Sequence, residues 1–146
     1  MVVSIIGPQG SGKTTLANKL ALKCSGGRKI YYCGFISSPF QYLKIQDLDS
    51  IKRDAVVIID DANAFLMSYN LFEKNSPLRE RIIMSRHYRL LLLFIFHSID
   101  DAIKFVYRQS QFIYVSEKYP DIKTLKLQFK ETVGKPGYRF YKARRY

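Results

Sequence analysis

The sequence predicts an α/β protein of three layers, in which helices cover both faces of a mainly parallel sheet. Two observations lead to this prediction. Short apolar runs suited to buried strands alternate along the chain with segments of helical spacing. The longest of these runs are continuously apolar, which is typical of parallel strands covered on both faces. The 146 residues suffice for one core, so we expect residues 1–146 to form a single domain.

The individual elements are separated by glycine, proline and capping residues. Strands are predicted at residues 2–6, 30–33, 55–59, 90–96 and 112–115, and helices at residues 15–23, 62–67, 78–87 and 100–106. Near the C-terminus, residues 125–128 and 138–142 alternate between polar and apolar types, and a Gly-Lys-Pro-Gly turn lies between them. This pattern predicts a β-hairpin at the edge of the sheet, within the basic segment 118–146.

The segment after the first predicted strand is rich in glycine and ends in Lys-Thr. Residues 7–14 fit the pattern G-x-x-x-x-G-K-[ST] at every fixed position, between a strand and a helix. Glycines let the backbone pass close to phosphate oxygens, and loop amides and a helix N-terminus attract anions. Lys13 can reach the β and γ phosphates, and the Thr14 hydroxyl can ligate Mg²⁺, so ATP and Mg²⁺ are the expected ligands. The residues expected to bind nucleotide are Gly7, Pro8, Gln9, Gly10, Ser11, Gly12, Lys13, Thr14 and Thr15.

Two adjacent acids follow the strand predicted at residues 55–59. An acid at the end of a buried strand holds Mg²⁺ in proteins of this kind, and Asp60 is the candidate for that role beside Thr14. Asp61 could polarise the attacking water as a general base, or it could cap the helix predicted at 62–67. Because His97 also follows a predicted strand, we expect these side chains to converge at the carboxyl ends of the strands.

The charge of the chain predicts a polyanionic partner. The formal net charge is +12, and residues 118–146 alone contain nine Lys or Arg residues against two acids. Lys142, Arg144 and Arg145 could contact nucleic-acid phosphates without reading sequence, or they could form a solubilising tail. No run approaches the ~20 apolar residues of a membrane span, and no signal peptide is recognisable, so we expect an intracellular protein.

Several of these features together resemble the genome-packaging ATPases of double-stranded DNA viruses in the FtsK–HerA superfamily. That group includes the poxvirus-type enzymes and those of icosahedral viruses with an internal membrane. The resemblance covers about residues 1–116. It rests on the glycine-rich motif, on Ile58-Ile59-Asp60-Asp61, on Ser85-Arg86-His87, and on the apolar strand at 90–96 that ends in a polar residue.

The resemblance implies roles for individual residues. Asp60 corresponds to the Walker B acid, and Asp61 stands where the family commonly has an acid that activates water. His97 stands where relatives usually have a glutamine that senses the γ-phosphate; an imidazole can donate to phosphate, but its protonation varies near neutral pH. Arg86 resembles the arginine that relatives insert into a neighbouring subunit's site, with Arg79 and Arg81 as rival candidates.

The resemblance also implies an assembly and a location. Such enzymes work as homo-oligomeric rings, here expected to be a pentamer or hexamer, that thread double-stranded DNA and contact a capsid or vertex protein. A location in the host cytoplasm or on the virion follows. Two other functions stay open: a small-molecule P-loop kinase, and a nucleotide-gated factor for phage assembly or export.

Overall fold

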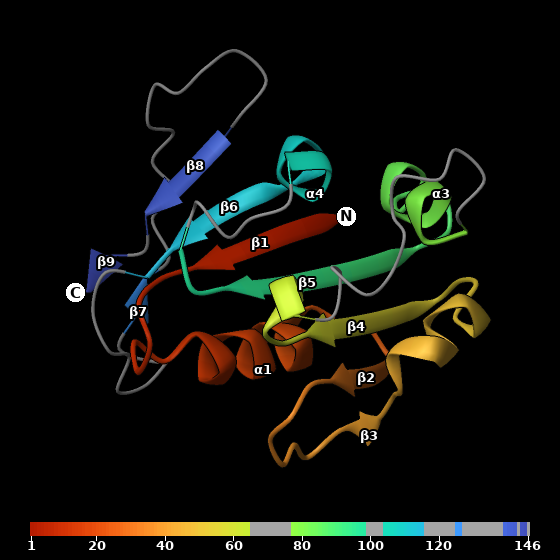
Figure 1. Cartoon of the computed structure of the whole chain (residues 1–146), viewed down its shortest axis with the longest axis horizontal. Helices are drawn as coiled ribbons and strands as arrows, with labels where there is room; N and C mark the ends of the chain where they lie inside the picture. The colour runs from red at the N-terminus through yellow and green to blue at the C-terminus, as the bar shows by residue number, and fades with distance from the viewer. Residues whose placement is uncertain (65–76, 99–103, 116–124, 127–138, 143, 146) are drawn as a thin grey trace.

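A seven-stranded, wholly parallel sheet forms the centre of the molecule. The computed structural model describes residues 1–64, 77–98, 104–115, 125–126, 139–142 and 144–145. The strands of this sheet follow the spatial order β3-β2-β4-β5-β1-β6-β8, and each neighbouring pair is parallel. They are β1 (Val2–Ile6), β2 (Lys29–Cys33), β3 (Gln41–Tyr42), β4 (Ala55–Ile59), β5 (Leu90–Phe96), β6 (Gln111–Tyr114) and β8 (Arg139–Lys142). In Figure 1 the arrowheads of β1, β4, β5 and β6 point to the same side of the molecule.

Helices cover both faces of the sheet. The described helices are α1 (Lys13–Cys24), the 3-10 helix η1 (Ile45–Ser50), α3 (Pro77–Ile83) and α4 (Lys104–Gln109), and residues 62–64 form a helical turn after β4. The helix predicted at 78–87 ends at Ile83. Residues 84–89 are turns instead, because the chain must reverse there to enter β5, and Arg89 takes a left-handed backbone conformation with φ 54°.

The two faces of each central strand pack against different helices. In β4, Val56 and Ile58 pack in the cluster that contains α1 residues, while Val57 and Ile59 pack in the cluster that contains α3 residues. All four side chains are 0% exposed. This division explains why the strand sequences are continuously apolar, and it confirms the predicted three-layer α/β architecture.

The predicted C-terminal hairpin is wrong. Residues 139–142 form β8 at the edge of the sheet, but β8 pairs in parallel with β6. The other half of the expected hairpin, Leu125–Lys126 (β7), pairs antiparallel with Arg144–Arg145 (β9) in a separate two-stranded sheet. Alternation correctly indicated strands, but it could not indicate the partner of each strand. The turn expected at 134–137 lies outside the described residues.

The described residues include no helix suited to crossing a membrane, no disulfide and no metal-binding cluster. Within the described part of the chain, no helix is long and apolar enough to cross a membrane. Both cysteines are free, Cys24 exposed and Cys33 buried. The described residues contain no cluster of three or more His, Cys, Asp or Glu side chains that could hold a metal ion.

Leu93→Ala tests the importance of the face that packs on α1. Leu93 in β5 is 1% exposed, so we expect the substitution to lower the free energy of unfolding by about 2–5 kcal/mol, since it leaves a cavity in a packed core. Urea denaturation measures this change. Leu22→Ala is the matched control, because Leu22 is 61% exposed and should change stability by no more than about 0.5 kcal/mol. Equal effects of the two substitutions would contradict the described core.

Candidate active site

A cavity of about 500 Å³ opens at the carboxyl ends of the central strands. Because β5 lies between β1 and β4 in the sheet, the residue after β5 is placed between the glycine loop and the paired acids. The cavity is lined by Gln9, Gly10, Gly12, Lys13, Thr14, Thr15, Phe35, Ile36, Asp60, Asp61 and His97. The structure therefore confirms that the glycine loop, the two acids and His97 line the same cavity.

The glycines of the loop are required for two different reasons. Gly10 and Gly12 have φ of 75° and 90°, in the left-handed region that favours glycine. Gly7 is different, because an added Cβ would collide with the carbonyl oxygen of Val115 and lie 3.0 Å from the Ser11 hydroxyl oxygen. The missing side chain of Gly7 lets the end of β1 pack against the residue that follows β6. The expected approach of Gly7 to a phosphate stays a prediction.

Polar groups of the loop are turned inward. The Lys13 ammonium donates to the Pro8 carbonyl oxygen at 2.7 Å, and the residue is only 5% exposed. Burial lowers the pKa of Lys13, and the Asp60 carboxylate opposes that shift. The Ser11 hydroxyl is buried with no hydrogen-bond partner among the described residues. A buried cation held by a loop carbonyl and an unsatisfied hydroxyl suit a site that takes an anion.

Thr14 and Asp60 meet although they are 46 positions apart in the sequence. The Thr14 hydroxyl, in the first turn of α1, donates to Asp60 Oδ2 at 2.9 Å. Asp60 is the residue directly after β4. Hydroxyl and carboxylate oxygens are the hard ligands that Mg²⁺ takes, usually with water and phosphate oxygens completing the octahedron. The residues present therefore fit a nucleotide-bound Mg²⁺.

Asp61 and His97 lie side by side in the lining of the cavity. The closest atoms, His97 Nε2 and Asp61 Oδ1, are 3.5 Å apart, and the side chains are 49% and 39% exposed. The Asp61 backbone is left-handed, with φ 49°, and its N–H donates to Asp60 Oδ1 at 2.9 Å. Among the described residues, the Asp61 carboxylate thus contacts His97 and does not cap the turn at 62–64. Because the Asp61 side chain is partly exposed, water in the cavity can reach its carboxylate.

Three residues that the sequence did not single out belong to this site. Tyr32, near the end of β2, donates its hydroxyl proton to Asp60 Oδ2 at 2.8 Å. Phe35 and Ile36, in the loop after β2, are 72% and 56% exposed and line the cavity. A tyrosine inside an apolar strand looks like a core residue, and no local signal indicates that β2 lies beside β4.

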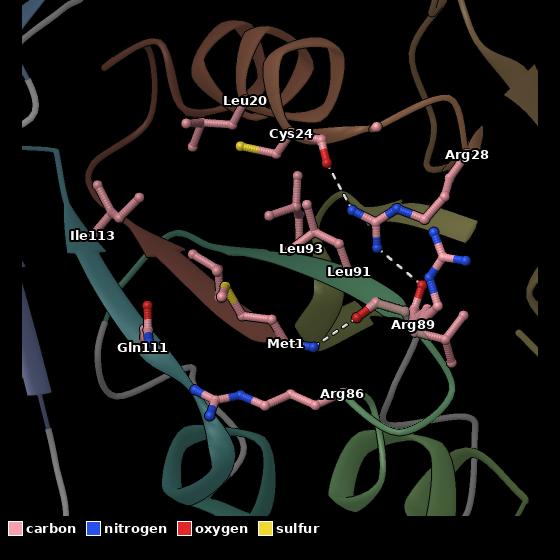
Figure 2. Close-up of a pocket in the computed structure, with 13 residues that line it drawn as sticks. Met1, Leu20, Cys24, Arg28, Arg86, Arg89, Leu91, Leu93, Gln111 and Ile113 are labelled. Atoms are coloured by element: carbon pink, nitrogen blue, oxygen red, sulfur yellow. Dashed lines mark hydrogen bonds between the residues drawn. The ribbon is translucent and has the colours of Figure 1, made fainter. Parts of the chain in front are cut away.

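Arg86 lies at the opposite end of the strands. It lines a second cavity, of about 580 Å³, beside residues that begin β1, β5 and β6. Figure 2 shows the Arg86 side chain extending toward Gln111 at the start of β6. Leu91 and Leu93 contribute to the apolar part of the lining. The seven residues of β5 span about 20 Å. Within one chain, Arg86 therefore does not reach the cavity formed by the glycine loop and the paired acids.

The rival arginines have partners within the chain. The Arg79 guanidinium lies 4.4 Å from the centroid of the Phe105 ring. Arg81 is 3.6 Å from an Asp49 carboxylate oxygen. Arg86, in contrast, is exposed, and no hydrogen bond or ion pair is found for its guanidinium among the described residues. The side chains of the three residues expected to bind nucleic acid, Lys142, Arg144 and Arg145, lie outside the described part of the structure.

Comparisons with known proteins support the fold. No family model matches the chain, and no curated protein matches its sequence. The AAA domain of FIGL-1 in complex with ADP aligns with a TM-score of 0.53 and 19% identity, covering 79% of this chain and 42% of that one. The genome-packaging NTPase B204 from Sulfolobus turreted icosahedral virus 2, in complex with AMP, aligns with a TM-score of 0.51 and 15% identity, covering 80% and 76%. This chain thus spans less than half of the FIGL-1 chain, and it has the α/β fold of P-loop NTPases, as the sequence predicted.

Proposed function

We propose that the chain is a Mg²⁺-dependent P-loop ATPase. The observation that supports this most directly is the convergence of Lys13, Thr14, Asp60 and Asp61 in one cavity, with the Thr14 hydroxyl on the Asp60 carboxylate. Bound Mg²⁺ would offset the charge of the β and γ phosphates. Thr14 and Asp60 would hold the cation, and Lys13 would exchange the Pro8 carbonyl for phosphate oxygens.

Asp61 is the residue proposed to orient the attacking water. Its carboxylate is partly exposed in the cavity, and His97 stands beside it. His97 is proposed to donate to the terminal phosphate from the end of β5, in the place of the glutamine usual in relatives. Water would attack the terminal phosphate in line with the leaving group, and no covalent bond to the protein would form. Most of the rate enhancement would then come from positioning the reactants and from neutralising the charge of the transition state.

The substrate moved by this ATPase is proposed to be double-stranded DNA, packaged as a viral genome. The net charge of +12, concentrated toward the C-terminus, supports a polyanionic partner. The fold shared with a viral genome-packaging NTPase is compatible with this role. Membership of the FtsK–HerA superfamily, contact with a capsid or vertex protein, and a place in the host cytoplasm or on the virion are parts of the same proposal.

A homo-oligomeric ring of five or six subunits would complete the active site. Arg86 is remote from its own cavity, exposed, and beside an apolar hollow. The guanidinium, which has no hydrogen bond or ion pair among the described residues, is available to a phosphate bound by a neighbouring subunit. In the ring, Arg86 of one subunit would enter the cavity of the next and neutralise charge that develops during hydrolysis.

ATP turnover at low salt, with and without long double-stranded DNA, tests the proposed function. We expect DNA to stimulate turnover, and added salt to weaken the stimulation because phosphate contacts are screened. Lys13→Ala and Asp61→Asn should each remove the DNA-stimulated turnover. Turnover that is indifferent to DNA would favour the small-molecule kinase. Nucleotide binding without turnover, even with DNA, would favour the assembly factor.

Mixing two inactive variants tests whether Arg86 acts in trans. Arg86→Ala should lose at least ~10³-fold in turnover, as expected for an arginine finger. Added Lys13→Ala protein, which has a defective cavity but an intact Arg86, should restore part of the activity. Arg53→Ala is the control, since Arg53 is an exposed arginine and should turn over ATP like the wild type. Failure of the mixture to recover activity, or wild-type activity of Arg86→Ala, would refute the trans role.

A further inference from the structure

We propose that Tyr32 is a positioning residue, whose hydroxyl holds the Asp60 carboxylate in the orientation that takes the nucleotide-bound Mg²⁺. This inference rests on the proposed nucleotide site and goes beyond it, because it adds a residue from β2 that contacts neither nucleotide nor cation. Gly34 is also required for this role, because its lack of a side chain leaves room for the Tyr32 ring.

The first observation is that the Asp60 carboxylate accepts three hydrogen bonds: one from β2, one from α1 and one from the adjacent residue. Oδ2 accepts the hydroxyl protons of Tyr32 at 2.8 Å and Thr14 at 2.9 Å, and Oδ1 accepts the Asp61 N–H at 2.9 Å. A hydroxyl that donates its proton to a carboxylate still has lone pairs for a cation, so Thr14 can serve both partners. Of the two hydroxyl donors, Thr14 lines the cavity beside Asp60, whereas Tyr32 is 1% exposed and is not part of the cavity lining. Tyr32 therefore orients the carboxylate without reaching the cation.

The second observation is that the Tyr32 side chain is itself fixed. The residue is 1% exposed and packs in the apolar cluster between the sheet and α1. The packed ring therefore holds its hydroxyl at the Asp60 carboxylate, to which a phenol donates its proton.

The third observation is the fit between the phenol and Gly34. A Cβ added at Gly34 would overlap the Tyr32 hydroxyl, and it would lie 2.6 Å from Cζ and 2.9 Å from Cε1 of the same ring. No positive φ is found at Gly34, so this glycine is needed for close approach and not for an unusual backbone conformation. The chain leaving β2 is thus packed directly against the end of the ring that reaches Asp60.

These contacts separate a positioning role from core filling. A ring that only filled the core would need no hydroxyl, and phenylalanine would serve there. Outer-shell partners orient the ligands of metal sites, and their removal typically lowers metal affinity by about 10- to 100-fold. We therefore expect the hydroxyl to affect the cation and not the binding of nucleotide by the glycine loop, which does not contact Tyr32 through the described hydrogen bonds.

The experiment is a Mg²⁺ titration of the binding of a fluorescent, non-hydrolysable ATP analogue. Tyr32→Phe should raise the half-saturating Mg²⁺ concentration about tenfold, with unchanged affinity for the analogue in EDTA. Tyr31→Phe is the matched control, because it also removes a phenol hydroxyl from β2, one residue earlier in the strand. This variant should have the same half-saturating Mg²⁺ concentration as the wild type. Gly34→Ala should reproduce the Tyr32→Phe shift, since the added methyl group displaces the phenol. Thermal unfolding by circular dichroism checks that each variant is folded.

The outcomes distinguish this inference from the proposed function. If the wild type binds the analogue with Mg²⁺ and Tyr32→Phe titrates identically, the positioning role is wrong and the proposed function stands. If Tyr32→Phe weakens binding equally in EDTA and in Mg²⁺, the hydroxyl has only a structural role, which also overturns the inference. If the wild type itself shows no binding under either condition, the proposed nucleotide site is wrong, and the role of Tyr32 falls with it.

Discussion

The hydrogen bond from the Thr14 hydroxyl to the Asp60 carboxylate is the interaction on which the candidate site depends. It joins the start of α1 to the end of β4, and it can form only because β1 and β4 run in parallel and end at the same edge of the sheet. Without that alignment the glycine loop would bind an anion but would lack the acid that pairs with it. The parallel sheet is therefore a requirement of the proposed chemistry and not only a scaffold.

Two glycines allow close packing at the carboxyl ends of the strands, where the cavity lies. At Gly7 the end of β1 packs against the Val115 carbonyl, and at Gly34 the chain leaving β2 packs against the Tyr32 ring. Each glycine permits a contact that a side chain would prevent. Each also comes shortly before residues that line the cavity, Gln9 after Gly7 and Phe35 after Gly34. Rigid packing around a polar site restricts its side chains to few orientations, which is the general condition for a preorganised active site.

The two ends of the sheet carry different chemistry. The carboxyl ends hold the acids and the glycine loop, whereas at the amino ends Arg86 lines a separate, largely apolar cavity. A single chain cannot bring these groups together, because the length of β5 separates them. In the proposed ring, each active site would be shared between two subunits, and hydrolysis in one subunit would then be sensitive to the position of its neighbour.

The sequence by itself determined the fold class and the central residues of the site. Residues 7–14 have a local pattern with a direct chemical meaning, and the continuously apolar strands indicated a sheet covered on both faces. Only the tertiary structure decided that β2 lies beside β4, that Tyr32 reaches Asp60, that β8 pairs in parallel with β6, and that Arg86 is remote from the cavity. The physical reason is that periodicity reports which side of an element is buried, whereas strand order and side-chain partners are set by packing between residues far apart in the chain.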